Sequence, residues 1–295
     1  MLGSNVPTIG GLHTGFEWAD KWGCESIQIY LTLSRRWDVQ ELAPEQIEKF
    51  KNSWQASSVK EVVAHIPFLV NLASSDKLLR DRSINRLVIE ISRAEKLGVR
   101  FLVLHPGSCT GTNKKEGLKN IIDGLNIVLQ RFNNISSKIL LETMAGQGNV
   151  LGASFEELAT IINHVDKSEF LGVCFDTGHV FMSGYKFKGY EGYEEVMNNF
   201  DKIISIGKIE VFHLNDSKTS LNSKSDRHAC IGEGELGLQV FHALLRDKRF
   251  FNRPKILEIP ERDIKSKKNL DLLKNLERRI DLLAEETLPT QLNLI

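Results

Sequence analysis

Cysteine is scarce in this sequence, and the patterns through which it usually acts are missing. Four cysteines occur among 295 residues, and no two of them form a CxxC pair. Their scatter argues against a disulfide framework and against a zinc cluster held by thiolates. We therefore expect Cys24, Cys109, Cys174 and Cys230 to be small buried side chains.

The sequence also lacks an excess of charge of one sign. Lys and Arg together number 38 and are balanced by 38 Asp and Glu. Bulk composition therefore gives no sign of an acidic partner, and a nucleic-acid role would need a local cluster of basic residues.

Neither a membrane span nor a signal peptide is visible. No apolar stretch approaches the roughly 20 residues that a spanning helix needs. The first residues, MLGSNVPTIGG, lack the basic region and hydrophobic core of a signal peptide. We expect a cytoplasmic protein with no membrane partner.

Continuous apolar runs, by contrast, recur along the whole chain. Eight of them read as buried strands: Leu2–Pro7, Ser26–Leu31, Val62–Pro67, Arg100–Gly107, Lys138–Thr143, Leu171–Thr177, Ile209–Asp216 and Lys255–Pro260. Amphipathic helical patterns lie between several of them, at Pro44–Ser57, Asp76–Leu97, Lys114–Phe132, Ser154–Val165 and Tyr193–Ile206. Ser154 followed by Glu157 has the spacing of a capping box, and Pro44 is typical of a first helical turn.

This alternation predicts the fold class. Runs that are apolar on both faces belong to parallel sheets, and eight strand–helix repeats favour a single (β/α)8 TIM barrel in the α/β class. A doubly wound open sheet is the alternative, but it usually has fewer strands, and no GxGxxG marks a dinucleotide-binding turn. We expect one domain over residues 1–295, with Glu286–Ile295 as a tail.

Nine potential metal ligands stand at the ends of the apolar runs or just beyond them. They are His65, His105, Glu142, Asp176, His179, His213, Asp226, His228 and Glu258. Active sites of (β/α)8 barrels form at the carboxyl ends of the strands, so these side chains should meet there. Five His with two Asp and two Glu, and no Cys, favour zinc, with manganese or iron as alternatives.

Each of these residues also has a purely structural interpretation. Asp176 alone could cap a helix, and Glu258 alone could be an ion-pair partner inside the barrel. A structural role for all nine, however, would bury many carboxylates and imidazoles at one barrel mouth without cations, which desolvation opposes. Isolated histidines such as His13, His164 and His242 are not expected to be ligands.

Six segments resemble the endonuclease IV family of apurinic/apyrimidinic (AP) endonucleases. They are HIPFLVNLAS (His65–Ser74), VLHPGS (Val103–Ser108), LLETMAGQGNVLG (Leu140–Gly152), GVCFDTGHVFMSGY (Gly172–Tyr185), HLNDSKTSLNSKSDRHACIGEGELG (His213–Gly237) and LEIP (Leu257–Pro260). The resemblance covers nearly the whole chain, and the stretch that begins at His213 is its most specific part. Asn5, Gly178 and Ile259 depart from residues frequent in the family (His, Cys and Thr), which affects the detail of the pocket.

The resemblance implies three zinc ions per chain, for which manganese could substitute. One ion would be held by His65, His105 and Glu142, a second by Glu142 as a bridge with Asp176, His213 and Glu258, and a third by His179, Asp226 and His228. It also implies catalytic roles for Glu142, Glu258 and Asp176. The implied reaction is hydrolysis of the phosphodiester 5′ to an abasic site by a zinc-activated hydroxide, together with removal of 3′-blocking groups in base excision repair.

The implied partner is double-stranded DNA with abasic sites or 3′-blocked ends, bound by a monomer. Arg35 and Arg36 follow the second strand, and Lys218, Lys224 and Arg227 lie between His213 and His228, where they could contact phosphates. Phe68 and Leu69 follow the third strand and could enter the base stack at the lesion. The alternatives are a solvated loop for the lysines and burial under a helix for Phe68 and Leu69.

Two other functions remain open at this point. A metal-dependent sugar isomerase or epimerase would share the barrel, but it typically needs one or two ions held mainly by carboxylates, so the group formed by His179, Asp226 and His228 argues against it. A lesion-binding protein without catalysis would have lost ligands, and none of the nine is missing.

Overall fold

Eight parallel strands form a closed barrel. The computed structural model describes residues 1–33 and 35–278. The strands are β1 (Leu2–Asn5), β2 (Ser26–Ile29), β3 (Glu61–His65), β4 (Phe101–Leu104), β6 (Lys138–Glu142), β8 (Leu171–Asp176), β9 (Ile209–Leu214) and β12 (Lys255–Leu257). They pair in the order β1-β12-β9-β8-β6-β4-β3-β2, and the β1–β2 pairing closes the ring. The predicted (β/α)8 barrel is confirmed.

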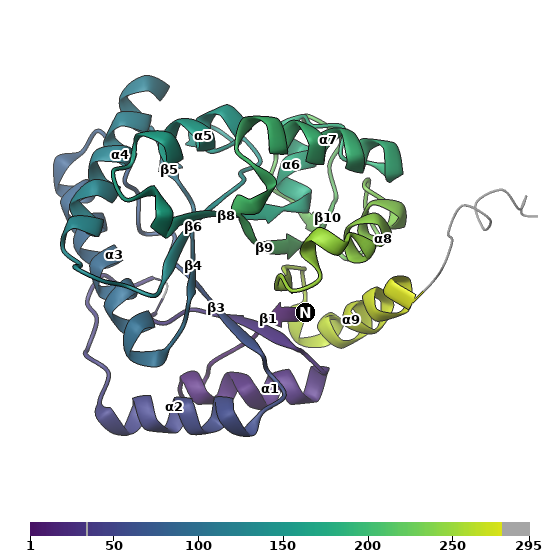
Figure 1. Ribbon diagram of the computed structural model, residues 1–295, viewed down its shortest axis with the longest axis horizontal. Helices are drawn as coiled ribbons and strands as arrows, with labels where there is room; N and C mark the ends of the chain where they lie inside the picture. The colour runs from purple at the N-terminus through teal and green to yellow at the C-terminus, as the bar shows by residue number, and fades with distance from the viewer. Residues whose placement is uncertain (34, 279–295) are drawn as a thin grey trace, which may run out of the picture.

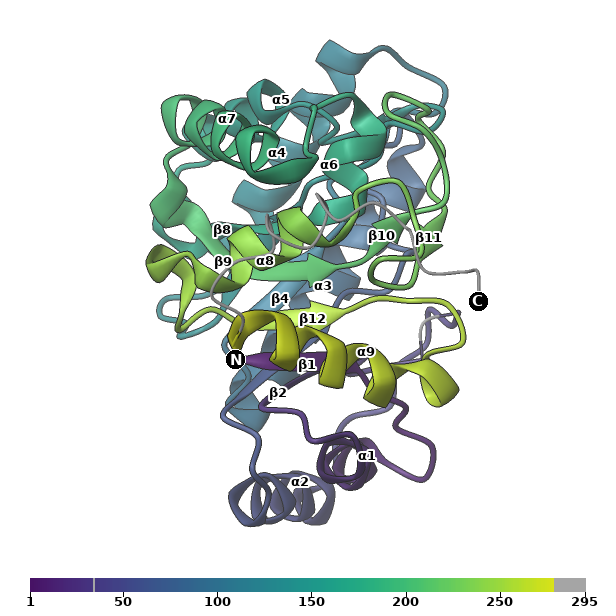
Figure 2. The same ribbon diagram turned by 90° about the vertical axis from the view of Figure 1, so that its right-hand side faces the viewer.

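Helices pack around the outside of the barrel (Figure 1, Figure 2). They are α1 (Gly15–Trp22), α2 (Pro44–Ala56), α3 (Lys77–Leu97), α4 (Lys114–Gln130), α5 (Phe155–His164), α6 (Thr177–Ser183), α7 (Gly189–Ile203), α8 (Leu238–Arg246) and α9 (Arg262–Arg278). Short 3-10 turns occupy Leu12–Thr14, Ser168–Phe170, Ile206–Lys208 and Lys248–Phe250. Among the described residues, no helix is long and apolar enough to cross a membrane.

A two-stranded antiparallel sheet and a short hairpin lie at the carboxyl end of the barrel. β5 (Gly107–Ser108) pairs antiparallel with β7 (Val150–Leu151), and β10 (Asp216–Ser217) pairs antiparallel with β11 (His228–Ala229). The hairpin matters for the site because it returns the chain from the end of β9 across the barrel mouth.

The two predicted helix-start signals, Pro44 and Ser154, are borne out, whereas the helix predicted from Tyr193 begins at Gly189. α2 begins at Pro44, and Ser154 Oγ accepts the Glu157 backbone N–H at 3.2 Å. The Glu157 carboxylate, however, accepts the N–H groups of Gly152 and Ala153 at 2.8 and 3.2 Å. The capping box is therefore only half formed, because Glu157 reaches past Ser154 to the two preceding residues.

The barrel interior is layered. At the amino end, Lys138 Nζ lies 2.6 Å from Glu210 Oε1, and Arg100 pairs with Glu61. Above these ion pairs lies a separate buried cluster, which we call the apolar plug: Val63, Phe101, Val103, Leu140, Cys174, Val211 and Ile256. The candidate ligands occupy the layer beyond the plug, at the carboxyl end.

One irregularity in strand pairing sets the geometry of that layer. The β8–β9 register shifts between Val173 and Cys174, and past the shift Asp176 stands opposite His213. Two side chains predicted as ligands are thereby brought to the same height in the barrel. The predicted tail, Glu286–Ile295, lies outside the described residues.

Candidate metal centre

All nine predicted ligands lie at the carboxyl end of the barrel. Seven belong to strand ends or the residues next to them: His65, His105, Glu142, Asp176, His179, His213 and Glu258. The other two, Asp226 and His228, come from the β10–β11 hairpin. Three subsets have ligand atoms within 4.8 Å of one another: His65, His105 and Glu142; Glu142, Asp176, His213 and Glu258; and Asp176, His179 and His228.

Glu142 is the centre of the arrangement. Its side chain is fully buried, and its Oε2 lies 3.2 Å from His65 Nε2 and 3.0 Å from His105 Nε2. Its Oε1 lies 3.1 Å from His213 Nδ1 and 3.4 Å from His179 Nδ1. One carboxylate therefore touches imidazoles that belong to all three subsets, and it could bridge two cations.

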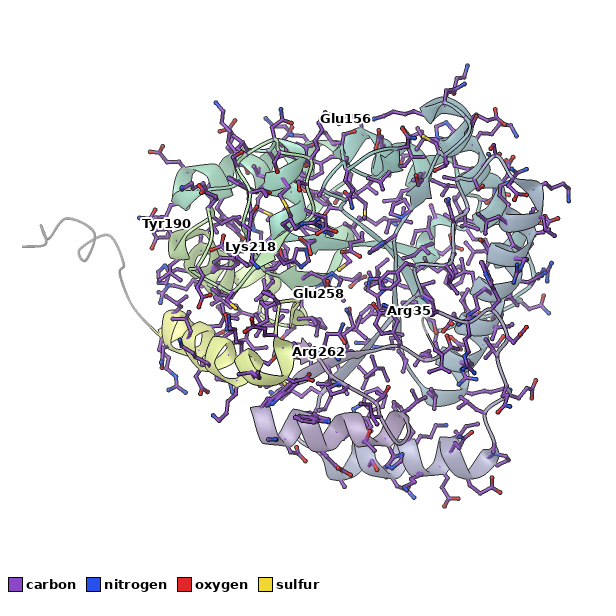
Figure 3. The ribbon with its side chains drawn as sticks, turned by 180° about the vertical axis from the view of Figure 1, so that it is seen from behind. Arg35, Glu156, Tyr190, Lys218, Glu258 and Arg262 are labelled. Carbon is purple, nitrogen blue, oxygen red and sulfur yellow. The ribbon has the colours of Figure 1, made fainter. Side chains whose placement is uncertain are left out.

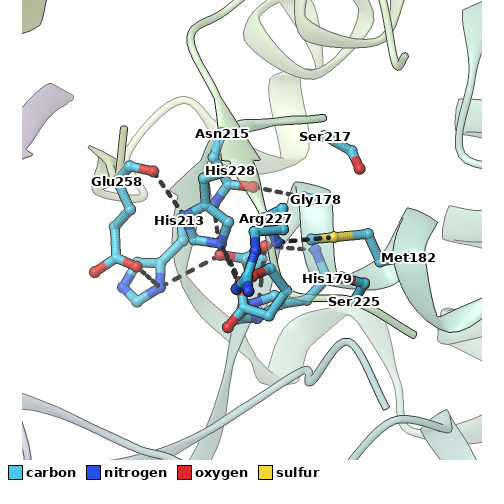
Figure 4. Close-up of polar contacts among 12 residues, drawn as sticks. Gly178, His179, Met182, His213, Asn215, Ser217, Ser225, Arg227, His228 and Glu258 are labelled. Carbon is cyan, nitrogen blue, oxygen red and sulfur yellow. Dashed lines mark hydrogen bonds and ion pairs between the residues drawn. The ribbon is translucent and has the colours of Figure 1, made fainter. Parts of the chain in front are cut away.

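The second subset is built around His213. Its Nδ1 lies 3.4 Å from Glu258 Oε2 and 3.8 Å from Asp176 Oδ2, in addition to its contact with Glu142. Figure 4 shows His213 and Glu258 side by side. Three carboxylates thus converge on one ring nitrogen.

The third subset brings the Nε2 atoms of two histidines together. His228 Nε2 lies 3.3 Å from His179 Nε2. Asp226 Oδ1 lies 3.3 Å from His179 Nε2 and 3.1 Å from His228 Nε2. Asp176 Oδ1 is also near, 3.6 Å from His179 Nδ1, so this subset has carboxylates on two sides.

Hydrogen bonds outside the centre fix the orientation of the histidines. Nδ1 faces a backbone carbonyl in three of them: His65 faces Ile66 at 2.8 Å, His179 faces Thr143 at 2.9 Å and His228 faces Glu258 at 2.9 Å. Donation from Nδ1–H to the carbonyl leaves Nε2 facing the carboxylates, where it could bind a metal ion once it has lost its proton. Histidines that bind metals in proteins are usually held in this way.

His213 is held in the opposite sense by Gln28, a residue that the sequence analysis missed. His213 Nε2 lies 2.8 Å from Gln28 Oε1, and Gln28 Nε2 donates to Glu258 Oε1 at 2.5 Å. Gln28 therefore turns His213 Nδ1 toward the carboxylates and fixes Glu258 as well. A polar side chain inside the apolar run SIQIYL was the available signal.

Asn215 and Thr143 were also missed, and both support Asp176. Asn215 Nδ2 donates to Asp176 Oδ2 at 2.7 Å, and the Asp176 N–H donates to Thr143 Oγ1 at 2.8 Å. Gly178 leaves room for this, because a Cβ there would lie 2.1 Å from Asn215 Oδ1.

The charged groups of the centre shift one another's pKa values. Burial alone would raise the pKa of the Glu142 carboxyl, but His105 and His213 hold it well below its ordinary value. Burial would lower the pKa of His179, yet Asp176 and the other nearby carboxylates raise it well above its ordinary value. The pKa of His213 is raised well above its ordinary value, also against the effect of burial. At Glu142, His179 and His213 the attraction between carboxylate and imidazole thus outweighs the effect of burial.

The donor set fits metal ions. Ring nitrogens and carboxylate oxygens face one another in a buried space, and the Nε2 atoms of His179 and His228 are directed at each other. Imidazole and carboxylate donors without thiolates are suited to zinc and also to manganese. The three subsets could hold metal ions.

The predicted DNA-contact residues lie on the same face as the centre. The Phe68 side chain is 59% exposed, and its ring centroid lies 6.4 Å from that of His65 and 6.2 Å from that of His105. Leu69 is half-buried, so it is less available than Phe68. The basic residues Arg35, Arg36, Lys218, Lys224 and Arg227 are exposed, and Figure 3 labels Arg35, Lys218 and the ligand candidate Glu258.

A pocket of about 410 Å³ opens beside the third subset. It is lined by Asn5, Tyr30, Asp226, Arg227, His228, Leu257, Glu258, Ile259, Pro260 and Arg262. Asn5 and Ile259 thus lie in one pocket next to candidate ligands.

Comparison with known proteins places the chain in a family. A family model described as a xylose isomerase-like TIM barrel matches residues 16–279. A probable endonuclease 4 of Trichlorobacter lovleyi is 39% identical over 277 residues, which cover 93% of this chain and 99% of that protein. The crystal structure of endonuclease IV from Thermus thermophilus superposes with a TM-score of 0.80 and 29% identity, covering 93% of this chain and 98% of that one.

The fold alone is shared more widely. The structure of a D-tagatose 3-epimerase-like protein superposes with a TM-score of 0.72 at 24% identity, covering 93% of this chain and 96% of that one. The shared barrel therefore does not distinguish a nuclease from an epimerase. The sequence identity to the endonucleases does distinguish them, because it extends over almost the full length of those proteins. The chain belongs to the endonuclease IV family within the xylose isomerase-like TIM barrels.

Proposed function

We propose that this protein is a zinc-dependent AP endonuclease. It would hydrolyse the phosphodiester 5′ to abasic sites in double-stranded DNA, leave a 3′-hydroxyl, and remove 3′-blocking groups in base excision repair, acting as a monomer. The observation that carries the proposal is the position of Glu142, in contact with histidines of all three candidate metal subsets. Family membership supports the same reaction class.

The proposed ligand sets follow the geometry. His65, His105 and Glu142 would hold one ion, and Glu142, Asp176, His213 and Glu258 a second. His179, His228 and Asp226 would hold a third, since Asp226 Oδ1 lies 3.3 and 3.1 Å from the two Nε2 atoms. We propose three zinc ions, with manganese as a substitute.

The bound ions and the side chains that hold them would have different roles in the reaction. Bound zinc ions would lower the pKa of a water nucleophile and neutralise charge that develops on phosphate and leaving-group oxygens. Glu142 would fix the spacing of the two ions that it bridges, and Asp176 and Glu258 would complete the second set. The apolar plug fills the barrel on the amino side of the centre, so we expect substrate and water to approach from the carboxyl end.

The loops around the carboxyl end of the barrel would bind the DNA. Phe68 is exposed above His65 and His105, where it could replace a missing base in the stack, with the half-buried Leu69 behind it. Arg35, Lys218 and Arg227 would contact phosphates and set the register without reading bases.

The test measures both the metal content of the protein and the substrate on which it acts. We expect close to three zinc ions per chain in gently purified protein, cleavage of a duplex with a single abasic site on its 5′ side, and no turnover of ketohexoses. Glu142→Gln keeps the shape of the side chain but removes its charge, and it should lower cleavage at least about 100-fold.

Two outcomes would contradict the proposal. One is sugar epimerisation by a metal-loaded protein that leaves abasic DNA intact. The other is a metal-replete Glu142→Gln protein that cuts as fast as the parent.

A further inference from the structure

Arg262 is a cation in the pocket beside the candidate metal centre, and the proposed chemistry does not use it. It shares the 410 Å³ pocket with Asp226, His228 and Glu258. Figure 3 shows Arg262 next to Glu258, with Arg35 farther round the barrel. A positive side chain therefore faces the same space as three of the candidate ligands.

The position of Arg262 is not explained by the stability of its helix. Arg262 is the first residue of α9, where the helix dipole disfavours a positive charge. The preceding residue, Glu261, has a φ of 52°, in the left-handed region that non-glycine residues rarely adopt. Backbone strain of this kind tends to persist where function requires it.

Asn5 holds the guanidinium in place. Arg262 Nη1 donates to Asn5 Oδ1 at 3.3 Å, and Arg262 Nε donates to Asp263 Oδ1 at 3.1 Å. A guanidinium has five N–H donors, so these two contacts leave others available to a ligand in the pocket. Asn5 is also the first-strand departure from the family, and its side-chain oxygen is the acceptor in this contact.

The segments that follow β1 and β12 carry two exposed apolar side chains. The Ile9 side chain is 88% exposed and that of Ile264 is 81% exposed. Ile9 follows β1 and Ile264 lies in the first turn of α9, after β12, and these two strands are hydrogen-bonded neighbours. Exposed apolar side chains together with an arginine are typical of surfaces that meet the DNA backbone and groove.

We propose that Arg262, positioned by Asn5, binds a phosphate of the DNA backbone beside the one that is cut. The proposal rests on the proposed function. A guanidinium can donate two parallel hydrogen bonds to the oxygens of one phosphate. Such contacts position the DNA strand without reading its sequence. Arg262 would thereby place the target phosphodiester over the metal centre from the β12–α9 side, with Tyr30 of the same pocket lying between it and Phe68.

The experiment compares two arginines of the same helix. Arg262→Gln is tested against Arg278→Gln, which removes an exposed arginine from the last turn of α9, far from the mouth. The readouts are the Kd for a duplex with a non-cleavable linkage at an abasic site, measured over a series of salt concentrations, and the metal content of each protein.

We expect Arg262→Gln to bind about tenfold more weakly, as is typical for the loss of a charged hydrogen bond. The slope of log K against log salt should fall in magnitude by about 0.9, the value for one phosphate contact. Arg262→Lys should recover the slope but not the full affinity, because lysine keeps the positive charge but lacks the paired N–H donors of a guanidinium. Metal content and Arg278→Gln should match the parent.

A second comparison tests Asn5 as the positioning residue. Asn5→Ala should weaken binding in the parent but add nothing in the Arg262→Gln background, since it acts through the arginine. If Arg262→Gln keeps the affinity and salt slope of the parent, or if Asn5→Ala is fully additive, this inference is wrong. If the parent itself neither binds nor cuts abasic DNA, it is the proposed function that fails.

Discussion

Gln28 shows how much of the candidate centre depends on a single side chain that is not itself a candidate ligand. Its amide contacts His213 with one atom and Glu258 with the other, at 2.8 and 2.5 Å. It therefore fixes both the ring orientation of one candidate ligand and the carboxylate of another. Outer contacts of this kind commonly account for a large share of metal affinity.

We expect Gln28→Leu to weaken zinc binding by about 10- to 100-fold, because His213 loses the acceptor that selects its tautomer. The measurement is competition with a chelator, with the thermal transition followed in parallel. Ser26→Ala is the matched control, since Ser26 lies on the same strand, is buried and donates its hydroxyl to the Met1 carbonyl at 3.3 Å. Equal zinc affinities in the two variants would show that Gln28 does not orient the centre.

The protons on His179 and His213 make metal binding depend on pH. In the metal-free protein both pKa values lie well above the ordinary value of about 6.5. Because the folded-state pKa is raised, these groups stabilise the apo protein fully below about pH 6.5, and this contribution is lost as pH rises through the raised pKa. Metal ions must displace the same protons, so zinc affinity should increase with pH over that window.

The check is the difference in Tm between zinc-loaded and zinc-free protein from about pH 6 to about pH 9. We expect this difference to widen steadily as pH rises, mostly because the apo protein becomes less stable. A difference that stays constant with pH would mean that these histidines are neutral in the apo protein.

At the residue scale, sequence pattern identified the nine candidate ligands but not their supports. Each candidate ends or follows an apolar run, which is a local signal. The partner of Gln28, by contrast, lies 185 residues away, and no local pattern reports such a contact. Phe68 and Leu69 were treated alike in the sequence, yet only the structure shows that Phe68 is exposed and Leu69 half-buried.

The connection from β9 to α8 is the element on which the third subset depends. It carries Asp226 and His228, and it is tied back to the barrel by Asp216. The Asp216 carboxylate accepts backbone N–H groups from four residues of this segment: Ser217 at 2.8 Å, Gly232 at 3.1 Å, Gly234 at 3.2 Å and Leu236 at 2.8 Å. One buried side chain thus closes a long loop.

We expect Asp216→Ala to lower the free energy of unfolding by at least about 2 kcal/mol, because several buried N–H groups lose their acceptor at once. The ion of the third subset should also be lost first, since Asp226 and His228 lie within the released segment. Denaturant unfolding and zinc content measure the two effects. Asp271→Ala, which removes an exposed partner of Lys267, should change stability by less than about 0.5 kcal/mol.

If Asp216→Ala unfolds like Asp271→Ala and keeps its zinc, the loop is held by other contacts. A selective loss of zinc with unchanged stability would also contradict the argument, because both effects are expected to arise from the same released segment.

The elements themselves were predictable to different degrees. The eight strands are continuous apolar runs, so their existence followed from the sequence, and only their ends differ from the predicted ranges. The helices α1, α6, α8 and α9 were not predicted. α6 has only seven residues, too few to show a period, and α9 is so rich in charge that its apolar face is weak.

At the scale of the whole molecule, two exposed phenylalanines at opposite ends of the barrel allow a test of DNA recognition. Phe68 lies at the carboxyl end and is 59% exposed, whereas Phe251 precedes β12 at the amino end and is 51% exposed. Truncating either one removes an exposed ring and little core packing.

We expect Phe68→Ala to bind abasic duplex about tenfold more weakly and to lose part of its preference over intact duplex, since the lost stacking is typically about 1–3 kcal/mol per base. Phe251→Ala should bind like the parent. Both variants should keep their zinc and their Tm. Should Phe68→Ala bind and cut like Phe251→Ala, the side chain that enters the stack lies elsewhere on the mouth.

The domain boundaries and the reaction were harder to predict from the sequence than the barrel architecture. A single domain over residues 1–295 stays a prediction, because the described residues end at 278 and the expected tail lies beyond them. The barrel is also shared with epimerase-like proteins, so architecture alone could not identify the reaction. The His213–Gly237 segment pointed to the endonuclease family instead, because this stretch is the most specific part of the resemblance.

The apolar plug has a kinetic consequence. Val63, Phe101, Val103, Leu140, Cys174, Val211 and Ile256 fill the barrel below the candidate ligands, and burial raises the pKa of the Cys174 thiol to about 12, so it stays protonated and offers no second path for an ion. We therefore expect ions and nucleic acid to reach the centre through the same opening, at the carboxyl end of the barrel. A duplex seated on the mouth would trap the ions beneath it, and a chelator should strip them more slowly from DNA-saturated protein than from free protein.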